Sequence, residues 1–459
     1  MADRLAIFKR RVSWSSPILF VASFFVMIVI GTVLLSLPFA TVSRGSMSLV
    51  DALFQSTSAV CITGLTTLTV ATDLTLFGQI VILVLFQAGA LGIMTYSLAL
   101  VSFVQQRGSP ERNEWLANIF THDRKLPPRR MLTWILRLTI AMEIAGVIAL
   151  FPVFFADYGG IKALYYSVFH SVSGFCNAGF SLFPTSLIGH QSSIPMNAIM
   201  TVLIVSGAIG FVVTFEVWRW VTGKRRWFKL LVQTKLVLAT YALLFAIGVV
   251  TLFVFEIGGQ NQEMPIGTRL LTAFFQSTLS RTSGFCTVDM STLTYPSLFF
   301  IIVYMFIGGA PGSTAGGIKV TTAAVLVLAF VSRYRSNPKT EVYNRSIPYD
   351  TIIRAVILTT VAALIVIVGT FLLQITELWG MPHREASGHF FDLLFEATSA
   401  FGTVGLSTGV TPTLTSAGRI VVLVLMFVGR VGPLTLAALL LGKQATSRLS
   451  YVEEDVMIG

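Results

Sequence analysis

The sequence predicts an all-α integral membrane protein, with eight transmembrane helices arranged as four span, pore-helix, loop and span repeats around one central pore. Three observations predict this fold. The 459 residues are 54% hydrophobic and only 12% charged, with a mean hydropathy of +0.79, whereas about a quarter of the residues of a soluble domain are charged. Long apolar segments recur along the chain, and a short motif between them occurs four times.

The long apolar segments account for the eight predicted spans, since a transmembrane helix needs about 20 apolar residues. Segments of that kind lie at 17–40, 75–103, 131–155, 194–218, 231–256, 294–332, 350–376 and 416–442. Four intervening stretches are apolar but too short to cross, at 48–65, 161–180, 267–285 and 387–406. The predicted divisions are a cytoplasmic N-terminus 1–12, pore repeats 13–105, 128–222, 230–336 and 350–445, and a cytoplasmic tail 446–459.

The basic residues explain the net charge of +11 without a nucleic-acid partner, because they flank the spans. Lys and Arg gather at the start and in alternate connections, for example at 107–130 and 224–229. By the positive-inside rule both termini are cytoplasmic, and an even number of spans agrees. No small-residue cleavage site precedes Pro38, so we interpret the first apolar run as a retained span in the plasma membrane.

The short motif starts with a phenylalanine and ends with a glycine. Its copies are 54–64, 169–179, 275–284 and 395–405, and the third is one residue shorter. The first half of each copy has helical character, and Ser48 to Asp51 resembles a capping box. Each copy therefore predicts a half-helix that stops at a glycine-containing loop between two spans.

Physical chemistry predicts what such loops do. Non-helical backbone cannot face lipid, because unpaired carbonyls cost several kcal/mol each, so the loops must line a cavity. Rings of carbonyl dipoles replace the water of a small cation, and half-helix C-termini favour cations over anions. The predicted ion-binding filter comprises Ile62, Thr63, Gly64, Asn177, Ala178, Gly179, Thr282, Ser283, Gly284, Thr403, Val404 and Gly405.

A second irregular stretch, 308–317, interrupts the sixth span with Pro311 and several glycines. Since Pro costs about 3 kcal/mol in a helix interior, we expect a break that crosses the pore below the filter as a gate. A kink without gating is the alternative. The predicted gate residues are Gly308, Gly309, Gly312, Ser313, Thr314, Ala315, Gly316, Gly317, Lys319 and Arg430.

The two basic residues of this set, Arg430 and Lys319, are assigned to the gate for different reasons. Arg430 lies deep in the last span, where a guanidinium is costly unless it faces the interior, so we expect it to point into the pore and bond loop carbonyls. A packing role is the alternative. Lys319, at the end of the irregular stretch, is equally well explained by snorkelling.

Other polar residues carry weaker expectations. Gln55, His170, Gln276 and Glu396 occupy one matched position after the repeated phenylalanine, where hydrogen bonding to the loop backbone is favoured over direct ion binding. Three cysteines, Cys61, Cys176 and Cys286, lack metal-ligand spacing and are expected to be small packing residues. Glu143 and Arg137 are assigned no function. Enzyme motifs are absent from the sequence, so we expect no enzyme and no covalently bound cofactor.

On the four glycine loops and the stretch 308–319, the chain resembles the Trk/Ktr/HKT superfamily of potassium and sodium transport proteins, and its length is most like that of the membrane subunits of bacterial Ktr systems. The resemblance covers nearly the whole chain. It implies potassium as the substrate, because Gly64 stands where sodium-preferring members carry serine. It also implies that 308–317 is the permeation gate and that Arg430 helps to close it.

The resemblance further implies a homodimer in the lipid membrane and a cytoplasmic ring of nucleotide-binding regulatory subunits (KtrA-like). The basic inner loops suit that ring, although anionic lipid explains their charge equally well. A sodium-selective or sodium-coupled member of the same superfamily is the alternative, and activation by sodium stays open. From another class, a non-conducting scaffold or membrane enzyme is the remote alternative.

Overall fold

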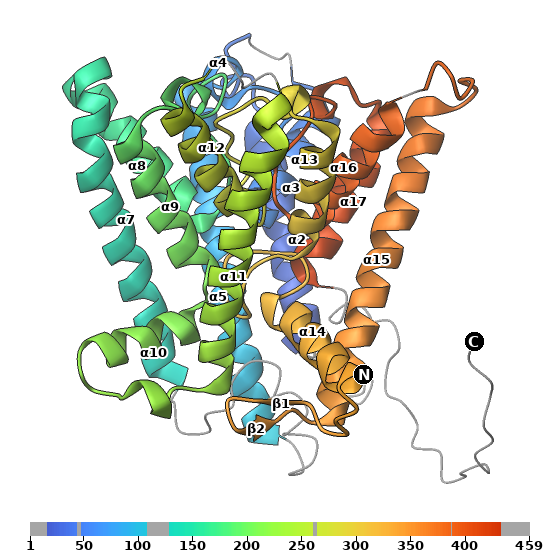
Figure 1. Ribbon diagram of the computed structural model, residues 1–459. Helices are drawn as coiled ribbons and strands as arrows, with labels where there is room; N and C mark the ends of the chain where they lie inside the picture. Colours follow the sequence, from blue (N-terminus) through green and yellow to red (C-terminus); the bar gives the residue numbers. More distant parts are fainter. Residues whose placement is uncertain (1–15, 44–46, 108–127, 260–263, 387, 433–459) are drawn as a thin grey trace, which may run out of the picture.

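The computed structural model describes residues 16–43, 47–107, 128–259, 264–386 and 388–432. Figure 1 shows a bundle of long helices with shorter helices packed among them. The first half of the chain contains α2 (Ser16–Leu35), α3 (Leu49–Cys61), α4 (Val70–Asp73), α5 (Leu76–Arg107), α7 (Pro128–Tyr158), α8 (Gly160–Cys176), η1 (Ile188–His190), α9 (Ile194–Ala208), α10 (Phe211–Val221) and η2 (Trp227–Lys229). The second half contains α11 (Val232–Phe255), η3 (Glu256–Gly258), α12 (Ile266–Leu279), η5 (Met290–Thr292), α13 (Tyr295–Phe306), α14 (Val320–Tyr334), β1 (Glu341–Val342), β2 (Arg345–Ser346), α15 (Tyr349–Leu378), α16 (His389–Gly402), η6 (Thr411–Thr413) and α17 (Ser416–Val431).

The helices differ in whether they can cross a membrane unaided. In the described residues, four are long and apolar enough, in α5, α7, α11 and α15, and a fifth span results if α9 and α10 count as one. In the same residues, shorter apolar helices are Val21–Leu35, Leu49–Cys61, Tyr295–Phe306 and Val320–Tyr334. The fold is therefore that of a helical, multi-pass membrane protein, while the number of eight stays a prediction. The predicted eighth span, 416–442, continues beyond the described residues.

Two predicted spans are not single helices. The fourth, 194–218, is bent by 111° between α9 and α10, where Gly210 adopts a φ of +89° that other residues resist. The sequence analysis counted this segment as one span and did not predict the bend, because a mostly apolar segment of this length has the composition of a span whether or not its helix is continuous. The sixth, 294–332, is divided into α13 and α14, which end and begin at Phe306 and Val320; the expected interruption is observed.

The helices that begin the four motif copies pack among the other helices in a closed cycle. They are α3, α8, α12 and α16. Each lies against the helix before it, in the pairs α2–α3, α7–α8, α11–α12 and α15–α16. Each also lies against a helix from another part of the chain, in the pairs α17–α3, α5–α8, α9–α12 and α13–α16. The last described helix, α17, thus contacts the first short one, α3, which closes the cycle.

The core and surface follow from this packing. The motif phenylalanines Phe54, Phe169, Phe275 and Phe395 are fully buried, and so anchor the short helices inside the bundle. Large apolar side chains are exposed along the long helices, for example Ile148 and Val250, as lipid-facing surfaces require. A two-residue hairpin, β1 with β2, pairs Glu341 with Ser346 and was not predicted.

Candidate functional site

Three of the short helices end in the same backbone geometry. Their last residues are followed by Ile62, Asn177 and Thr403, each in the left-handed conformation with φ of 58°, 59° and 49°. In the first, the amide of Ile62 donates to the Ala59 carbonyl at 3.1 Å and that of Thr63 to the Ser58 carbonyl at 2.8 Å. This is the Schellman pattern, which ends a helix and redirects the chain. It turns the loop residues into the centre of the bundle.

The third short helix ends differently. After α12 the residue Ser280 keeps right-handed helical angles, and no left-handed residue precedes Gly284. The Thr282 and Ser283 amides instead both donate to the Leu279 carbonyl, at 3.1 and 3.2 Å. The missing residue of the third motif copy is therefore the left-handed cap, and the loop still delivers its glycine to the same place as the others.

The four motif glycines form a closed ring. All have positive φ, from 65° at Gly284 to 92° at Gly64. A Cβ added to any of them would collide with the carbonyl oxygen of the residue before the glycine in the next loop; for Gly64 the distance to the Ala178 oxygen would be 2.7 Å. The contacts run Gly64 to Ala178, Gly179 to Ser283, Gly284 to Val404 and Gly405 to Thr63. Glycine is thus required for both conformation and space.

Serine hydroxyls brace these loops, and the sequence analysis missed them. Ser58 and Ser399 accept hydrogen bonds from the amides of Gly64 and Gly405, both at 3.1 Å. Ser173 donates to the Phe180 carbonyl at 2.7 Å. The third copy carries Leu279 at this position. A serine in the fifth place of three copies was the signal that could have identified them.

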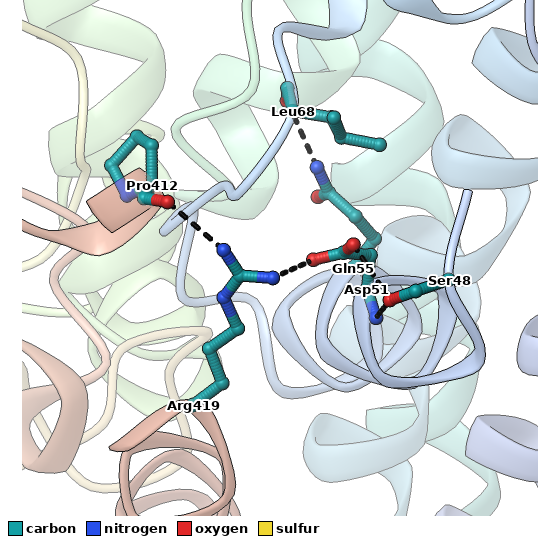
Figure 2. Close-up of polar contacts among 6 residues, drawn as sticks. All are labelled: Ser48, Asp51, Gln55, Leu68, Pro412 and Arg419. Carbon is teal, nitrogen blue, oxygen red and sulfur yellow. Dashed lines mark hydrogen bonds and ion pairs between the residues drawn. The ribbon is translucent and has the colours of Figure 1, made fainter. Parts of the chain in front are cut away.

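The matched polar residues after each phenylalanine mostly hold the segment beyond the loop. Gln55 donates to the Leu68 carbonyl at 2.9 Å (Figure 2). His170 bonds the Ser181 hydroxyl at 3.1 Å, and Glu396 accepts from Ser407 at 2.8 Å and from Thr411. Both side-chain amide atoms of Gln276 lack a partner among the described residues. Only Gln55 bonds loop backbone as expected, and it does so four residues after its glycine.

The irregular stretch between α13 and α14 folds into a compact loop. The Gly308 amide donates to the Ile318 carbonyl at 2.8 Å and closes its base. Two further amides, of Ala310 and Thr314, donate to the carbonyls of Ala208 and Gly207 at 3.0 and 3.2 Å. The carbonyls at the end of α9 that the bend releases are thus satisfied by the loop, as buried backbone requires. The bend between α9 and α10 and the loop between α13 and α14 therefore stabilise each other through these hydrogen bonds.

Both basic residues of the predicted gate donate to loop carbonyls. Arg430, which is 2% exposed, donates from Nη1 to the Thr314 oxygen. Lys319 donates from Nζ to the Ala315 oxygen at 2.7 Å, so its side chain folds onto the loop. Arg430 Nε and Nη2 lack partners among the residues that the structure describes. Two basic side chains therefore cap two successive carbonyls.

The loop also contacts residues of the predicted filter. Asn177 donates to the Thr314 hydroxyl at 2.8 Å and accepts from the Thr282 hydroxyl at 3.0 Å. A Cβ on Gly316 would collide with the Thr403 hydroxyl. The structure therefore brings together the filter and gate residues that the sequence singled out, with Asn177 linking the second and third filter loops to the intramembrane loop.

Arg281 is a site residue that sequence reasoning missed. Its guanidinium is 2% exposed, lies 4.3 Å from the centre of the Tyr241 ring, and leaves Nε and Nη1 without partners in the described part of the chain. The Tyr241 hydroxyl donates to the Ala208 carbonyl at 3.0 Å, the same oxygen that the loop amide of Ala310 bonds. A charged residue three places before Gly284 was the available signal.

At the other end of the short helices, an ion pair joins the first short helix, α3, to the last described helix, α17. Arg419 on α17 pairs with Asp51 on α3 at 2.6 Å and donates to the Pro412 carbonyl at 2.9 Å (Figure 2). Asp51 in turn accepts from the Ser48 hydroxyl at 2.7 Å, while Ser48 accepts from the Asp51 amide at 3.1 Å. Ser48 therefore caps α3 as the sequence suggested, although Asp51 bonds the Ser48 hydroxyl rather than the Ser48 amide that a full capping box uses. The Asp51 carboxylate also helps to close the cycle of helices.

The cysteines are free, and Cys61 and Cys176 are buried. Cys176, directly before the second glycine loop, donates to the Gln87 side-chain oxygen at 3.0 Å, and Gln87 donates to Glu143 at 2.8 Å. These contacts explain the position of Glu143, to which the sequence assigned no function.

An apolar helical bundle with a ring of inward backbone loops defines a class of protein that handles ions in the bilayer. Comparison with known proteins specifies the class: residues 12–446 match the TrkH family, described as cation transport proteins. The chain belongs to this family, and is a transporter rather than an enzyme.

Individual relatives agree. The chain is 35% identical to the potassium/sodium uptake protein NtpJ of Enterococcus hirae, over 99% of this chain and 100% of that protein. It is 34% identical to the Ktr system potassium uptake protein B of Bacillus subtilis, over 98% of both chains. The crystal structure of the potassium transporter TrkH from Vibrio parahaemolyticus shares the fold, with a TM-score of 0.71 at 20% identity, covering 94% of this chain and 86% of that one.

Proposed function

We propose that this protein takes up potassium across the plasma membrane through the ring of glycine loops. The observation that carries the proposal is the closed contact of Gly64, Gly179, Gly284 and Gly405 with the carbonyls of the neighbouring loops. Such a ring supplies oxygen ligands that replace the hydration shell of a monovalent cation. The relatives named above as potassium uptake proteins support potassium as the ion.

We further propose eight spans in four pore repeats, with both termini cytoplasmic and 308–317 as the gate. The closed cycle of helix contacts supports the repeats. For the gate, support comes from Arg430 and Lys319, which hold loop carbonyls beside the filter. The buried guanidinium of Arg430 there opposes the passage of a cation until the loop moves.

The proposed assembly is a homodimer with a cytoplasmic ring of nucleotide-binding subunits. A relative is named as protein B of a Ktr system, which suggests further components. Sodium is the second candidate, as a transported or activating ion, because another relative is named a potassium/sodium uptake protein.

The test is ion flux in liposomes that contain the purified protein. We expect potassium to move faster than sodium, and Gly64→Ser to reduce that preference, because a side chain at this position meets the Ala178 carbonyl. An unchanged preference in a folded Gly64→Ser variant contradicts the filter assignment. Faster sodium than potassium flux in the unmodified protein favours the second candidate.

A further inference from the structure

The end of α10 and the turn after it, residues 216–229 and here called the α10 corner, expose an unusual group of side chains. Trp218, Trp220, Trp227 and Phe228 are 41%, 41%, 44% and 63% exposed. The same segment carries five basic residues and one acidic residue, which are Arg219, Lys224, Arg225, Arg226, Lys229 and Glu216. Exposed aromatic rings interleaved with cations need a partner that is both apolar and anionic.

The conformation of the α10 corner is fixed by the contacts of Glu216, its one carboxylate. Glu216 is 1% exposed and accepts from the Leu231 amide at 3.0 Å and the Thr234 hydroxyl at 2.6 Å. It also pairs with Arg225 at 2.6 Å. These contacts fix α10 to the start of α11, so the rings and the other cations are presented on a rigid support.

The α10 corner lies at the end of the helical bundle where two apolar spans begin. Figure 1 shows α10 at the lower end of the molecule, beside α7 and α11, whose apolar spans begin at Met131 and Val232. Trp134, in the first turn of the span in α7, packs against Trp218 with ring centres 5.1 Å apart. Tryptophan is enriched at this level of a membrane, where headgroups meet acyl chains.

The cations lie over the aromatic rings rather than away from them. Lys224 Nζ is 4.6 Å from the centre of the Trp218 ring, and Arg226 lies 5.9 Å from that of Phe228. Charges held beside rings that insert among lipids sit at the height of the phosphate groups. Basic residues close to a membrane surface attract anionic lipid by about 1 kcal/mol each.

The other end of α10 reaches the proposed gate. The Phe211 amide, the first of the helix, donates to the Gly312 carbonyl at 3.2 Å. A Cβ on Gly210 would lie 2.6 Å from the Pro311 oxygen, so the start of α10 is in direct contact with the loop. A helix of 11 residues therefore connects the corner to the loop, over about 16 Å at 1.5 Å per residue.

We propose that the α10 corner binds anionic phospholipid headgroups and that lipid bound there acts on the intramembrane loop through α10. The binding site stands on its own geometry, whereas the action on the loop rests on the proposed function. A soluble acidic protein is the competing partner, but it does not account for exposed tryptophans at the level where the apolar spans begin.

The test of binding uses the full chain in nanodiscs with increasing fractions of brominated phosphatidylglycerol, which quenches nearby tryptophan fluorescence. The variant Lys224→Gln/Arg226→Gln/Lys229→Gln removes cations of the corner and leaves the filter and loop intact. Its matched control is Arg333→Gln/Arg335→Gln/Lys339→Gln, an equal change of charge in the exposed segment formed by the last turn of α14 and the residues after it. Thermal melting of each variant confirms folding.

We expect half-maximal quenching in the corner variant to need at least about tenfold more anionic lipid than in the unmodified protein, with the control unchanged. The binding site is overturned if both variants bind lipid as well as the unmodified protein does, or if both lose the same amount of lipid affinity. Retained lipid binding with lost binding of a soluble cytoplasmic partner also overturns it.

The action on the loop is tested by potassium flux in vesicles with and without phosphatidylglycerol. For the unmodified protein and for the control variant, we expect potassium flux to differ severalfold between vesicles with and without phosphatidylglycerol. For the corner variant, we expect the same flux in both kinds of vesicle. Lipid binding without any such difference overturns the action on the loop. If no vesicle shows potassium flux, the proposed function fails, while the quenching result still decides the lipid site.

Discussion

The guanidinium of Arg430 donates a hydrogen bond to the main-chain carbonyl of Thr314, and so ties the end of α17 to the loop between α13 and α14. These residues are 116 positions apart in the sequence. Because Arg430 is buried and only this donor is matched among the described residues, the contact is the main polar anchor of its side chain. It joins a fixed charge to the loop that we propose as the gate.

Replacing Arg430 tests whether this anchor closes the pathway. Arg430→Met removes both bond and charge, and we expect severalfold faster potassium flux in liposomes, since the loop is released and a barrier to cations is lost. Arg430→Lys keeps the charge but lacks the planar fork, and we expect an intermediate flux. Arg333→Met, at an exposed cation, is the control and should leave flux unchanged.

The two Arg430 variants separate the planar guanidinium from the positive charge. If Arg430→Lys conducts like the unmodified protein, a cation at this position suffices and the planar guanidinium is not needed. Unchanged or slower flux in folded Arg430→Met contradicts the gate assignment.

The ring of glycines predicts a sharp contrast between two substitutions on the fourth loop. Gly405 and Gly409 have similar φ of 89° and 98°, but a Cβ at Gly405 would collide with the Thr63 carbonyl, whereas Gly409 faces open space. Both alanine variants carry the left-handed strain of about 1–2 kcal/mol. We expect Gly405→Ala to reduce potassium flux at least about tenfold, because it displaces a carbonyl of the ring.

Gly409→Ala is the matched control, and we expect lower thermal stability with flux retained. Equal flux in the two variants would show that backbone strain, rather than closure of the ring, explains the glycine at 405.

How far the sequence predicts this architecture depends on whether a signal is local. The glycine motif and the Pro311 region identified the four loops and the interrupted helix, because Gly and Pro act on their own backbone. The left-handed Ile62 and Thr403 were not predicted, since β-branched residues avoid that conformation and only the packing of four loops imposes it. The bend at Gly210 and the stacking of Arg281 on Tyr241 likewise depend on partners distant in the sequence.

Asn177 connects two filter loops to the intramembrane loop, so its side chain is expected to stabilise all three. Asn177→Asp keeps the shape and tolerates the left-handed backbone, but its oxygen cannot donate to the Thr314 hydroxyl or to the Ile204 carbonyl, 2.8 and 3.1 Å away. We expect a loss of about 1–3 kcal/mol in unfolding free energy and a weaker preference for potassium.

Thr314→Val supplies the control, because it removes the hydroxyl partner and leaves Asn177 in place. If the Asn177–Thr314 bond matters, the double variant is less destabilised than the sum of the single variants. Additive shifts in thermal stability would show that the two side chains act independently.

The Arg419–Asp51 pair predicts how the cycle of helices is held at the end opposite the intramembrane loop. Their side chains are only 19% and 14% exposed, and the guanidinium also bonds the Pro412 carbonyl. Screening by salt is therefore incomplete, and we expect a coupling of about 1 kcal/mol, at the upper end for partly exposed pairs. The measurement is a double-mutant cycle of Arg419→Gln and Asp51→Asn by thermal melting in detergent.

Asp51→Asn retains a side-chain oxygen for the helix cap that Ser48 and Asp51 form, so its effect reports mainly the lost charge. We expect potassium selectivity to survive in both variants, because the pair lies outside the glycine ring, and stability to fall. Loss of selectivity without loss of stability would contradict a purely structural role of the Arg419–Asp51 pair. It would mean that this outer contact between α3 and α17 sets the geometry of the first and fourth loops.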